Sequence, residues 1–466
     1  MRQRDAIQRL PRVEAPQAEA QKENICQRST ATGALCREFL IIVDRINPPH
    51  SAVIDLNNEI KDFYDQHPYP PPVRDLESYR QKWDSDARLR YEFHLLWPNA
   101  DYREDIDILV AGCGTSQAAK HAIRQPAARV TGIDISTTSL ANTRELKRKY
   151  QLENLDIQEL SIEWVAELGG QFDKIICTGV LHHLADPVRG LRALRSVLKP
   201  QGAMQLMVYA AYGRTGIHML QSYARHLGIQ ATETEIKDLI AVLKELPRGH
   251  PLDYVLREAP DFRNPAALAD ALLNPRERAY TVPQVFEYLA RSGMVFGRWY
   301  RQAPYLPQCG VLVGTPHAAR LADLPTQEQY AAVELFRGTI TSHSFTAYRD
   351  DSPLDQPLIC FDRENWTAFV PIINPRLVCL EENLPAGAAA VLINQDHVNP
   401  DLIHLVNTSE KILFDAIDGQ RRIGEILEAA LLTKGERIDL KTARRFFARL
   451  WCYDHAVFDT SQSNAT

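Results

Sequence analysis

The chain has 466 residues, a length that predicts two or three domains rather than one. Hydrophobic residues make up 45% of it and charged residues 24%, which is the balance of an ordinary globular protein. Its formal net charge of -6 disfavours a nucleic-acid-binding role, because such proteins usually carry a basic excess. There is no apolar run of about 18 residues and no apolar leader, so neither a membrane span nor a secretion signal is expected.

The eight cysteines are scattered along the chain and form no Cys-x-x-Cys pair. This pattern supports neither a zinc site nor a disulfide framework, and no metal is predicted. Several cysteines sit inside apolar runs, where a cysteine usually acts as a small buried hydrophobic residue. A reducing, cytoplasmic location is therefore the expectation.

The N-terminal part is predicted to hold a flexible arm over residues 1–45 and a strap or lid over residues 46–104. The stretch HPYPPP within the strap requires a stiff, extended backbone, because each proline fixes its own φ and restricts the residue before it. Two aromatic side chains nearby, Tyr64 and Tyr69, either pack the strap onto the next domain or form a lid over a bound ligand. The sequence leaves both roles open.

From residue 105 to residue 210, strand-like and helix-like segments alternate. The predicted strands cover residues 106–112, 129–136, 155–160, 172–180 and 203–210. Continuous apolar strands that alternate with helices are typical of a parallel sheet covered on both faces. We therefore expect an α/β, Rossmann-like domain.

This domain is predicted to extend to residue 316, with a helical insertion over residues 213–275. A further helix over residues 281–293 begins at a threonine and ends at a glycine, both common helix boundaries. Two apolar segments follow, residues 294–307 and 309–316, which are close enough in sequence to pair as antiparallel strands. They would complete a mixed seven-stranded sheet.

Residues 320–466 have a different sequence pattern from the rest of the chain. Short strand-like pieces are followed by two predicted helices and a final strand within residues 409–458. This pattern is typical of a small α+β, winged-helix-like accessory domain. Winged helices often bind DNA, but the chain lacks the basic stripe that phosphate contacts require. No nucleic-acid partner is predicted.

The stretch DILVAGCGTSQAAKHA carries the first chemical signal. Gly112 and Gly114 flank Cys113 and let the backbone turn sharply and approach a ligand closely. A dinucleotide site normally has a third glycine, where this sequence has Gln117, because the pyrophosphate lies against the start of the following helix. A nucleotide-like cofactor without phosphates fits the turn better.

Asp134 carries the second signal, at the end of the second predicted strand and twenty-two residues after Gly112. This is near the spacing at which a carboxylate accepts hydrogen bonds from both hydroxyls of a ribose. Such an acid on its own is weak evidence. Its position after a Gly-x-Gly turn, within alternating strands and helices, strengthens the interpretation.

These segments resemble class I S-adenosylmethionine-dependent methyltransferases in order and spacing. The resemblance rests on ILVAGCGTS, VTGIDIS, FDKIICTGVLHHLADPVRGL and LKPQG, and it covers residues 105–210. HPYPPP, GVLHHLADP, YGRTGI and YTVPQVFEYL are also similar to segments of a bacterial subgroup with a "PYP" strap, over residues 60–316. The resemblance implies S-adenosylmethionine as cofactor and methyl transfer as reaction.

The resemblance also implies which residues bind the cofactor. The glycine turn would contact the methionyl part, Asp134 the ribose and Ile135 the adenine, while Thr178 would lie beside the transferred methyl. Ser161 stands where many members have an aspartate near the adenine amine, and Ser116 stands where the third glycine of the turn is usual. The implied cofactor-binding residues are Gly112, Cys113, Gly114, Asp134, Ile135, Ser161, Ile162 and Thr178.

Two histidines follow the fourth predicted strand. In many relatives this pair shapes the site without moving protons, and we expect that role for His182. His183 is the candidate catalytic base, because a few small-molecule methyltransferases use a histidine that matches its position, and an ordinary imidazole titrates near neutral pH. A purely structural role for His183 remains the alternative.

The acceptor is left open by the sequence. Methyl transfer needs little beyond aligning a nucleophile with the activated methyl group and excluding water, so no triad or metal cluster is required. The helical insertion is expected to build the acceptor pocket for a small molecule or natural product. The alternatives are a protein or peptide acceptor recruited by the C-terminal domain, favoured by an open groove, and a non-catalytic cofactor-binding regulator.

Overall fold

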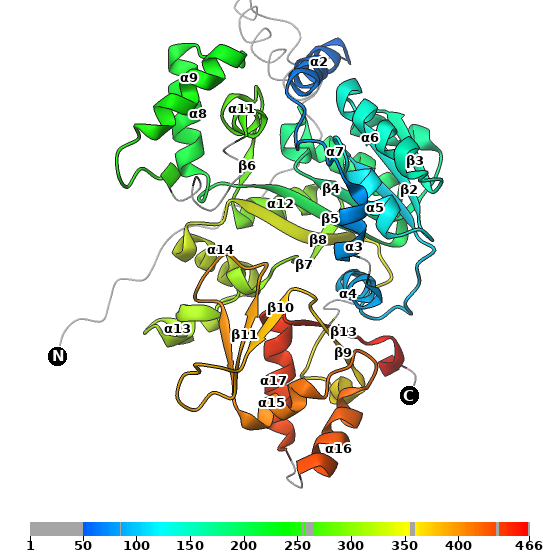
Figure 1. Ribbon diagram of the computed structural model, residues 1–466, viewed down its shortest axis with the longest axis vertical. Helices are drawn as coiled ribbons and strands as arrows, with labels where there is room; N and C mark the ends of the chain where they lie inside the picture. The colour runs from blue at the N-terminus through cyan, green and yellow to red at the C-terminus, as the bar shows by residue number, and fades with distance from the viewer. Residues whose placement is uncertain are drawn as a thin grey trace, which may run out of the picture. The chain divides into compact units, whose positions relative to one another are not determined.

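The computed structural model describes residues 50–464, apart from residues 84, 254–255, 257–263, 355–358 and 435–437. The arm predicted over residues 1–45 lies outside the described residues. A mixed sheet with helices on both faces forms the centre of the described chain, and a smaller group of strands and helices follows it (Figure 1).

The central sheet has eight strands in the order β3-β2-β1-β4-β5-β8-β7, with a short β6 paired to β5. The first five strands run parallel, and β8 is antiparallel to both of its neighbours. The strands are β1 (Asp107–Ala111), β2 (Arg129–Asp134), β3 (Leu155–Glu159), β4 (Phe172–Thr178), β5 (Leu198–Ala210), β6 (Ala279–Tyr280), β7 (Met294–Trp299) and β8 (Ser342–Arg349). The mixed Rossmann-like sheet predicted from the sequence is confirmed.

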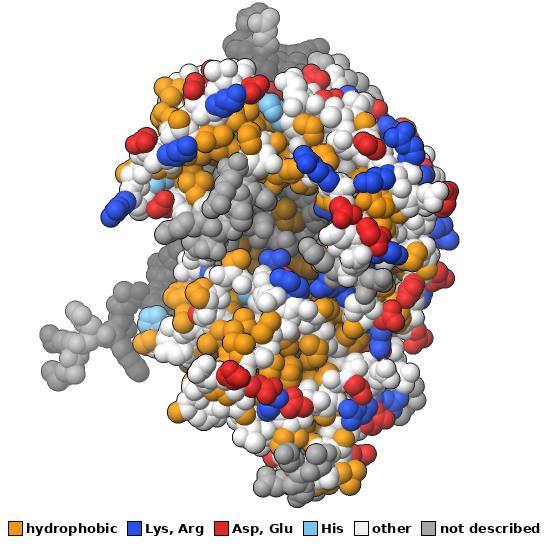
Figure 2. Space-filling model, viewed as in Figure 1, with side chains coloured by type: hydrophobic (Ala, Val, Ile, Leu, Met, Phe, Trp, Pro, Cys, Tyr) orange, Lys and Arg blue, Asp and Glu red, His pale blue; other side chains and the backbone are white. Residues whose placement is uncertain are grey.

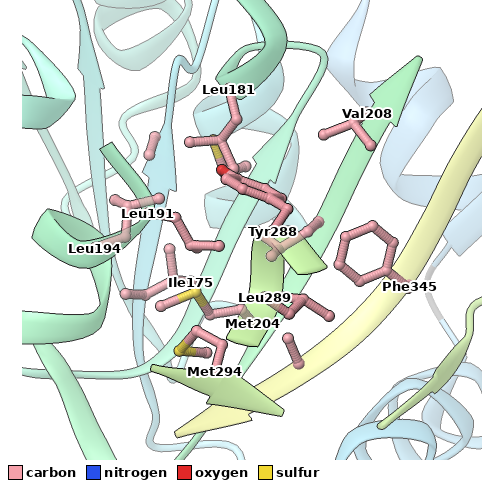
Figure 3. Close-up of a cluster of buried hydrophobic side chains, with 14 of the residues drawn as sticks. Ile175, Leu181, Leu191, Leu194, Met204, Val208, Tyr288, Leu289, Met294 and Phe345 are labelled. Carbon is pink, nitrogen blue, oxygen red and sulfur yellow. The ribbon is translucent and has the colours of Figure 1, made fainter. Parts of the chain in front are cut away.

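Helices cover both faces because alternate residues of the central strands are apolar on each side. On one face, α7 (Pro187–Ser196) and α12 (Val282–Arg291) pack on β4 and β5. Figure 3 shows this core, with Leu191 of α7 and Tyr288 of α12 lying near Ile175 and Met204 of the strands. On the other face, α5 (Gln117–Arg124) and α6 (Thr137–Tyr150) bury their own apolar residues against β1 and β2.

The last strand of the sheet corrects one expectation. The strand predicted over residues 309–316 is wrong, because this run forms a 3-10 turn over Gly310–Gly314 with Val311 and Val313 more than half exposed. β8 takes its place, from within the segment assigned to the C-terminal part. Its alternation buries Phe345 and Ala347, which gives the sheet the apolar face that the valine-rich run does not supply.

The segment before the sheet is mostly helical. It consists of α2 (His50–Gln66), α3 (Leu76–Trp83) and α4 (Asp86–Leu96), with an extended stretch between α2 and α3. Tyr69 lies in this extended stretch, whereas Tyr64 lies in the last turns of α2. The predicted strap is therefore a short proline-rich connection between helices.

Helices also occupy the segment after β5, where an insertion was predicted. They are α8 (Thr215–Leu227), α9 (Glu233–Lys244) and α11 (Pro265–Leu273). Ile217, Ile236 and Leu268 give these helices a shared apolar cluster, which Phe63 of α2 joins. The insertion and the end of α2 thus pack as one layer beside the carboxyl ends of the strands.

The C-terminal part is an α+β structure with its own core, which includes Phe446 and Phe458. After α13 (Ala318–Ala322) and α14 (Thr326–Arg337), its elements are β9 (Val370–Ile373), β10 (Leu377–Leu380), β11 (Ala390–Asn394), β12 (Ile403–Val406), α15 (Thr408–Asp415), α16 (Ile423–Lys434), α17 (Leu440–Cys452) and β13 (Ala456–Asp459). Asp454 ties it to the sheet, because its buried carboxylate accepts hydrogen bonds from Arg298 and the Ala303 amide.

Candidate functional site

A cavity of about 840 Å³ lies at the carboxyl ends of β1, β2 and β4. This volume is within the usual range for a site that encloses a small ligand. Every residue that the sequence predicted for the site lines it. These residues are Tyr64, Tyr69, Gly112, Cys113, Gly114, Asp134, Ile135, Ser161, Ile162, Thr178 and His183.

The glycine turn forms one wall of the cavity. Gly112 and Gly114 have φ values of 70° and 54°, in the left-handed region that glycine tolerates best. A Cβ on Gly112 would lie 2.3 Å from a methyl carbon of Val180, so a larger residue has no room there. The amides of Gly112 and Cys113 both donate to the Ile133 carbonyl, at 2.8 and 2.9 Å, which fixes the turn against β2.

The carboxylate of Asp134 is held in place by backbone donors. Its Oδ2 accepts from the Gly114 amide at 2.8 Å, and its Oδ1 accepts from the Ser136 amide at 2.9 Å. Burial raises the pKa of Asp134, and the backbone hydrogen bonds oppose that rise without cancelling it. Each carboxylate oxygen has a second lone pair, so the group can still accept from a ligand hydroxyl.

Gln117 joins the glycine turn to the end of β4. Its side-chain amide donates to the Thr178 hydroxyl at 3.0 Å, from the first turn of α5. Gln117 lies where a dinucleotide-binding turn has its third glycine. The side chain at that position closes the approach that a pyrophosphate would use, which agrees with a cofactor that lacks phosphates.

The residues after β3 form an apolar floor. Ile162 is buried, and Ile135 after β2 lines the cavity with it. The Ser161 hydroxyl donates to the Glu163 carboxylate, and the Leu160 amide donates to the Asp134 carbonyl at 3.0 Å. Ser161, at a position where the family resemblance implies an aspartate, thus points its hydroxyl at the acid two residues later.

The proline-rich stretch and α2 contact the glycine turn and the loop after β2. Thr115 donates its hydroxyl to the Pro70 carbonyl at 2.7 Å, next to the glycine turn. Lys61 of α2 donates to the Ile135 carbonyl at 2.8 Å, and Asp65 accepts from the Ser136 hydroxyl at 2.8 Å. The N-terminal segment therefore fixes both loops that carry the predicted cofactor residues.

A buried carboxylate organises the side of the cavity under the helical insertion. Asp270 of α11 is 3% exposed and accepts from the hydroxyls of Tyr64 and Tyr209, at 2.8 and 3.3 Å. Asn274 donates to both Asp270 and Tyr64. Sequence reasoning missed Tyr209 and Asp270, although one acid within the apolar helix PAALADALL was a signal.

A buried ion pair lies beside these tyrosines. Arg214 and Glu277 are both nearly inaccessible and form two hydrogen bonds, at 3.1 and 2.7 Å. The Arg214 guanidinium also lies 3.6 Å from the centroid of the Tyr209 ring, within cation–π range. This pair fixes the Tyr209 ring without adding net charge to the cavity.

His183 has a defined tautomer. Its Nδ1 lies 2.6 Å from the Arg276 carbonyl, which only accepts, so Nδ1 carries the proton of the neutral ring. Its Nε2 then holds the lone pair. His183 lines the cavity, and its Nε2, itself buried, is left without a hydrogen-bond partner among the described residues.

His182 differs from its neighbour. It is fully buried, and its ring lies 3.9 Å from that of Tyr209, centroid to centroid. Burial lowers its pKa well below the ordinary value, and the nearby charge of Arg214 adds to this. The contacts of His182 are those of a neutral packing residue.

Two other kinds of site are absent from the part of the chain that the structure describes. No group of three or more His, Cys, Asp or Glu side chains lies close enough together to hold a metal ion. No helix in that part of the chain has the length and apolar character needed to cross a membrane.

Comparisons with known proteins bear on the family. A sequence model described as "Methyltransferase domain" matches residues 109–204. An uncharacterised protein of Synechococcus is 32% identical, over 63% of this chain and 72% of its own length. The ubiquinone biosynthesis O-methyltransferase of Pseudomonas aeruginosa is 27% identical, over 42% of this chain and 88% of its own.

One solved structure shares the fold over most of the chain. PKMT2 from Rickettsia typhi, in complex with AdoHcy, has a TM-score of 0.59 and 16% sequence identity. The match covers 84% of this chain and 77% of that protein, so it includes much of the sequence on both sides of the methyltransferase segment.

Proposed function

This chain belongs to the class I S-adenosylmethionine-dependent methyltransferases, and from that premise we propose that it methylates a small molecule held under the helical insertion. The observation that carries the proposal is a single cavity that joins the glycine turn and Asp134 to His183 and the insertion. A cofactor and an acceptor can therefore meet without solvent between them.

The residues on one side of the cavity fit S-adenosylmethionine. Asp134 offers the fixed acceptor that two ribose hydroxyls need, and Ile135 and Ile162 offer the apolar surface that an adenine ring needs. The turn at Gly112–Gly114 and Thr178 would take the methionyl part, with Ser161 near the adenine amine. When bound, the cofactor supplies an activated methyl group on its sulfonium.

His183 would act as the base that deprotonates the acceptor. Its Nε2 would take the proton from an attacking hydroxyl or amine, while Nδ1 stays bound to the Arg276 carbonyl. Tyr64, Tyr209 and Asp270 would orient the acceptor, since they line the same part of the cavity. Tyr69 and the proline-rich stretch above the turn would limit the access of water.

The named relative supports a small acceptor, because its name is that of an enzyme of ubiquinone biosynthesis. A protein or peptide acceptor has one observation in its favour, since Val398 of the C-terminal part also lines the cavity. The two proposals differ in the size of the molecule that becomes methylated. We also propose that the protein is located in the cytoplasm.

Isotope transfer tests the proposal. The protein is incubated with methyl-labelled S-adenosylmethionine and, separately, with the small-molecule and protein fractions of a cell extract. We expect label in the small-molecule fraction, and transfer only to protein would overturn the small-acceptor proposal. Cofactor binding by calorimetry without any transfer would indicate a non-catalytic regulator instead.

A further inference from the structure

The cavity extends beyond the proposed cofactor side, along one face of α5. Gln117, Lys120, His121 and Arg124 line it and are spaced three or four residues apart, so their side chains share a face of the helix. Gln117 starts this row beside Thr178, at the proposed methyl position. Its far end lies about 10 Å further on, because a helix rises about 1.5 Å per residue.

Aromatic rings form the opposite wall of this region, which we call the α5 lobe (Tyr79, Trp83, Lys120, Arg124 and Tyr300). The Tyr79 and Trp83 rings of α3 stack with their centroids 5.6 Å apart. The Lys120 ammonium lies 5.7 Å from the Tyr79 centroid, and the Arg124 guanidinium lies 5.2 Å from the Trp83 ring. The lobe therefore combines flat apolar surfaces with cationic groups.

Cationic side chains in and around the α5 lobe outnumber the acidic ones that contact them. Glu92 binds Arg124 through two hydrogen bonds, at 3.0 and 2.7 Å, which neutralises that guanidinium. Lys120 is half-buried, and its side-chain ammonium forms no ion pair or hydrogen bond with any described residue. Burial lowers the pKa of Lys120, and no carboxylate opposes that effect.

A second lysine adds to this imbalance. Lys174 of β4 is 3% exposed and lies close to Glu92 and Arg124. Burial lowers its pKa to about 8, and the positive charge of Arg124 acts in the same direction. Glu92 thus lies near Arg88, Arg124 and Lys174, and no carboxylate of the described residues pairs with the ammonium of Lys120. Figure 2 shows Lys and Arg side chains gathered below the centre of one face of the molecule.

We propose that the α5 lobe binds an acidic group of the acceptor, a carboxylate or a phosphate, with Lys120 as its counter-ion and the aromatic rings against its apolar body. This inference rests on the proposed function, because it places the acid group and the methylated atom in one acceptor molecule. The row from Gln117 to Arg124 separates them by at most about 10 Å. Uncharged acceptors of the same shape would then bind more weakly.

Binding of simple probes tests the proposal directly. Benzoate and phenyl phosphate carry the acid on an aromatic ring, and benzyl alcohol is their uncharged counterpart. We expect calorimetry on the protein saturated with S-adenosylhomocysteine to show at least a ten-fold lower Kd for one of the two anions than for benzyl alcohol. Binding of the anion should also quench tryptophan fluorescence, and Trp83→Phe should remove that change.

Lys120→Gln is the decisive variant. It should raise the Kd of the anion at least ten-fold and leave the Kd of S-adenosylhomocysteine unchanged. Lys237→Gln is the matched control, since Lys237 is an exposed lysine of α9 paired with Glu233, and it should alter neither constant. Circular dichroism checks that both variants keep the helical content of the parent.

Three results would overturn the proposal. The first is equal binding of anions and benzyl alcohol, or no saturable anion binding at all. The second is unchanged anion binding by Lys120→Gln. The third is a selective loss of S-adenosylhomocysteine affinity in that variant, which would assign Lys120 to the carboxylate of the cofactor. Failure of the proposed function is a separate outcome, because it is measured by isotope transfer: label only in the protein fraction, or no transfer at all, would refute it whatever the anion-binding result.

Discussion

The two sides of the cavity are built in different ways. On the proposed cofactor side, polar contacts are made mainly by backbone amides of neighbouring segments, such as those of Gly114 and Ser136 to Asp134. On the proposed acceptor side, side chains contact one another across long stretches of sequence, and Tyr64 is 206 residues from its partner Asp270. The first side is a property of local sequence, whereas the second exists only in the folded chain.

This difference has a consequence for substitutions. Backbone contacts survive most side-chain changes, so on the cofactor side only a few positions, such as Asp134 and the glycines, should be sensitive. A side-chain network loses one contact with each replacement, so its members should show smaller and more evenly distributed effects.

Replacing Asp134 should have the largest effect. Asp134→Ala removes the acceptor for the ribose hydroxyls and also releases the two amides that hold the turn. We expect the Kd of S-adenosylmethionine to rise at least 100-fold, about 2.8 kcal/mol, by calorimetry. Asp156→Ala, an exposed position on β3, is the control and should leave the affinity unchanged. An unaltered Kd in Asp134→Ala would refute the cofactor assignment.

Replacing His183 should separate catalysis from cofactor binding. His183→Gln keeps a polar side chain but removes the base, so kcat should fall about 100-fold while the Kd of S-adenosylmethionine stays constant. His226→Gln, an exposed histidine of α8, should behave like the parent protein.

A small loss of kcat in His183→Gln would contradict the catalytic role. His183 would then be a residue that only shapes the site. The rate is measured with the acceptor found by isotope transfer.

The same contrast explains what the sequence could predict. Strands β1 to β5 were predicted because each is a short apolar run followed by a helix, a pattern that depends on neighbouring residues alone. The glycine turn and Asp134 were predicted for the same reason, since they directly follow two of those strands. These residues lie in one cavity because the carboxyl ends of parallel strands meet at one edge of a sheet.

The remaining features depend on partners distant in sequence. The run at residues 309–316 has strand-forming valines but pairs with no strand, so its prediction as a strand was wrong. β8 begins at Ser342, well after this run, and mixes buried and half-exposed residues, a pattern that identifies a strand only once its partners are known. Asp270 is marked in the sequence as the one acid of an apolar helix, but nothing near it or near Tyr209 indicates that the two are in contact.

Removing one hydroxyl from the acceptor side should have an intermediate effect. Tyr64→Phe deletes the hydrogen bond to Asp270 and retains the ring. Losing one such contact costs about 1 kcal/mol, so we expect KM for the acceptor to rise about five-fold with little change in cofactor affinity. Tyr223→Phe, on the exposed side of α8, is the control. A larger change in cofactor affinity than in KM would place Tyr64 on the cofactor side.

The smallest effect concerns the dependence of cofactor binding on pH. Each ribose hydroxyl finds an acceptor oxygen on Asp134 only while the carboxylate is ionised, because protonation turns one of its two oxygens into a donor. Burial has raised the pKa of that group above its ordinary value. The affinity for S-adenosylmethionine should therefore be constant near neutral pH and fall as the pH decreases through the raised pKa. This fall should begin at a higher pH than it would for an exposed aspartate. Calorimetry across acidic buffers measures this fall, and Asp134→Asn should bind weakly at every pH without it. If the parent protein shows no such fall while it remains folded, the ribose hydroxyls bind elsewhere. The cofactor side would then depend, like the acceptor side, on residues that the local sequence does not reveal.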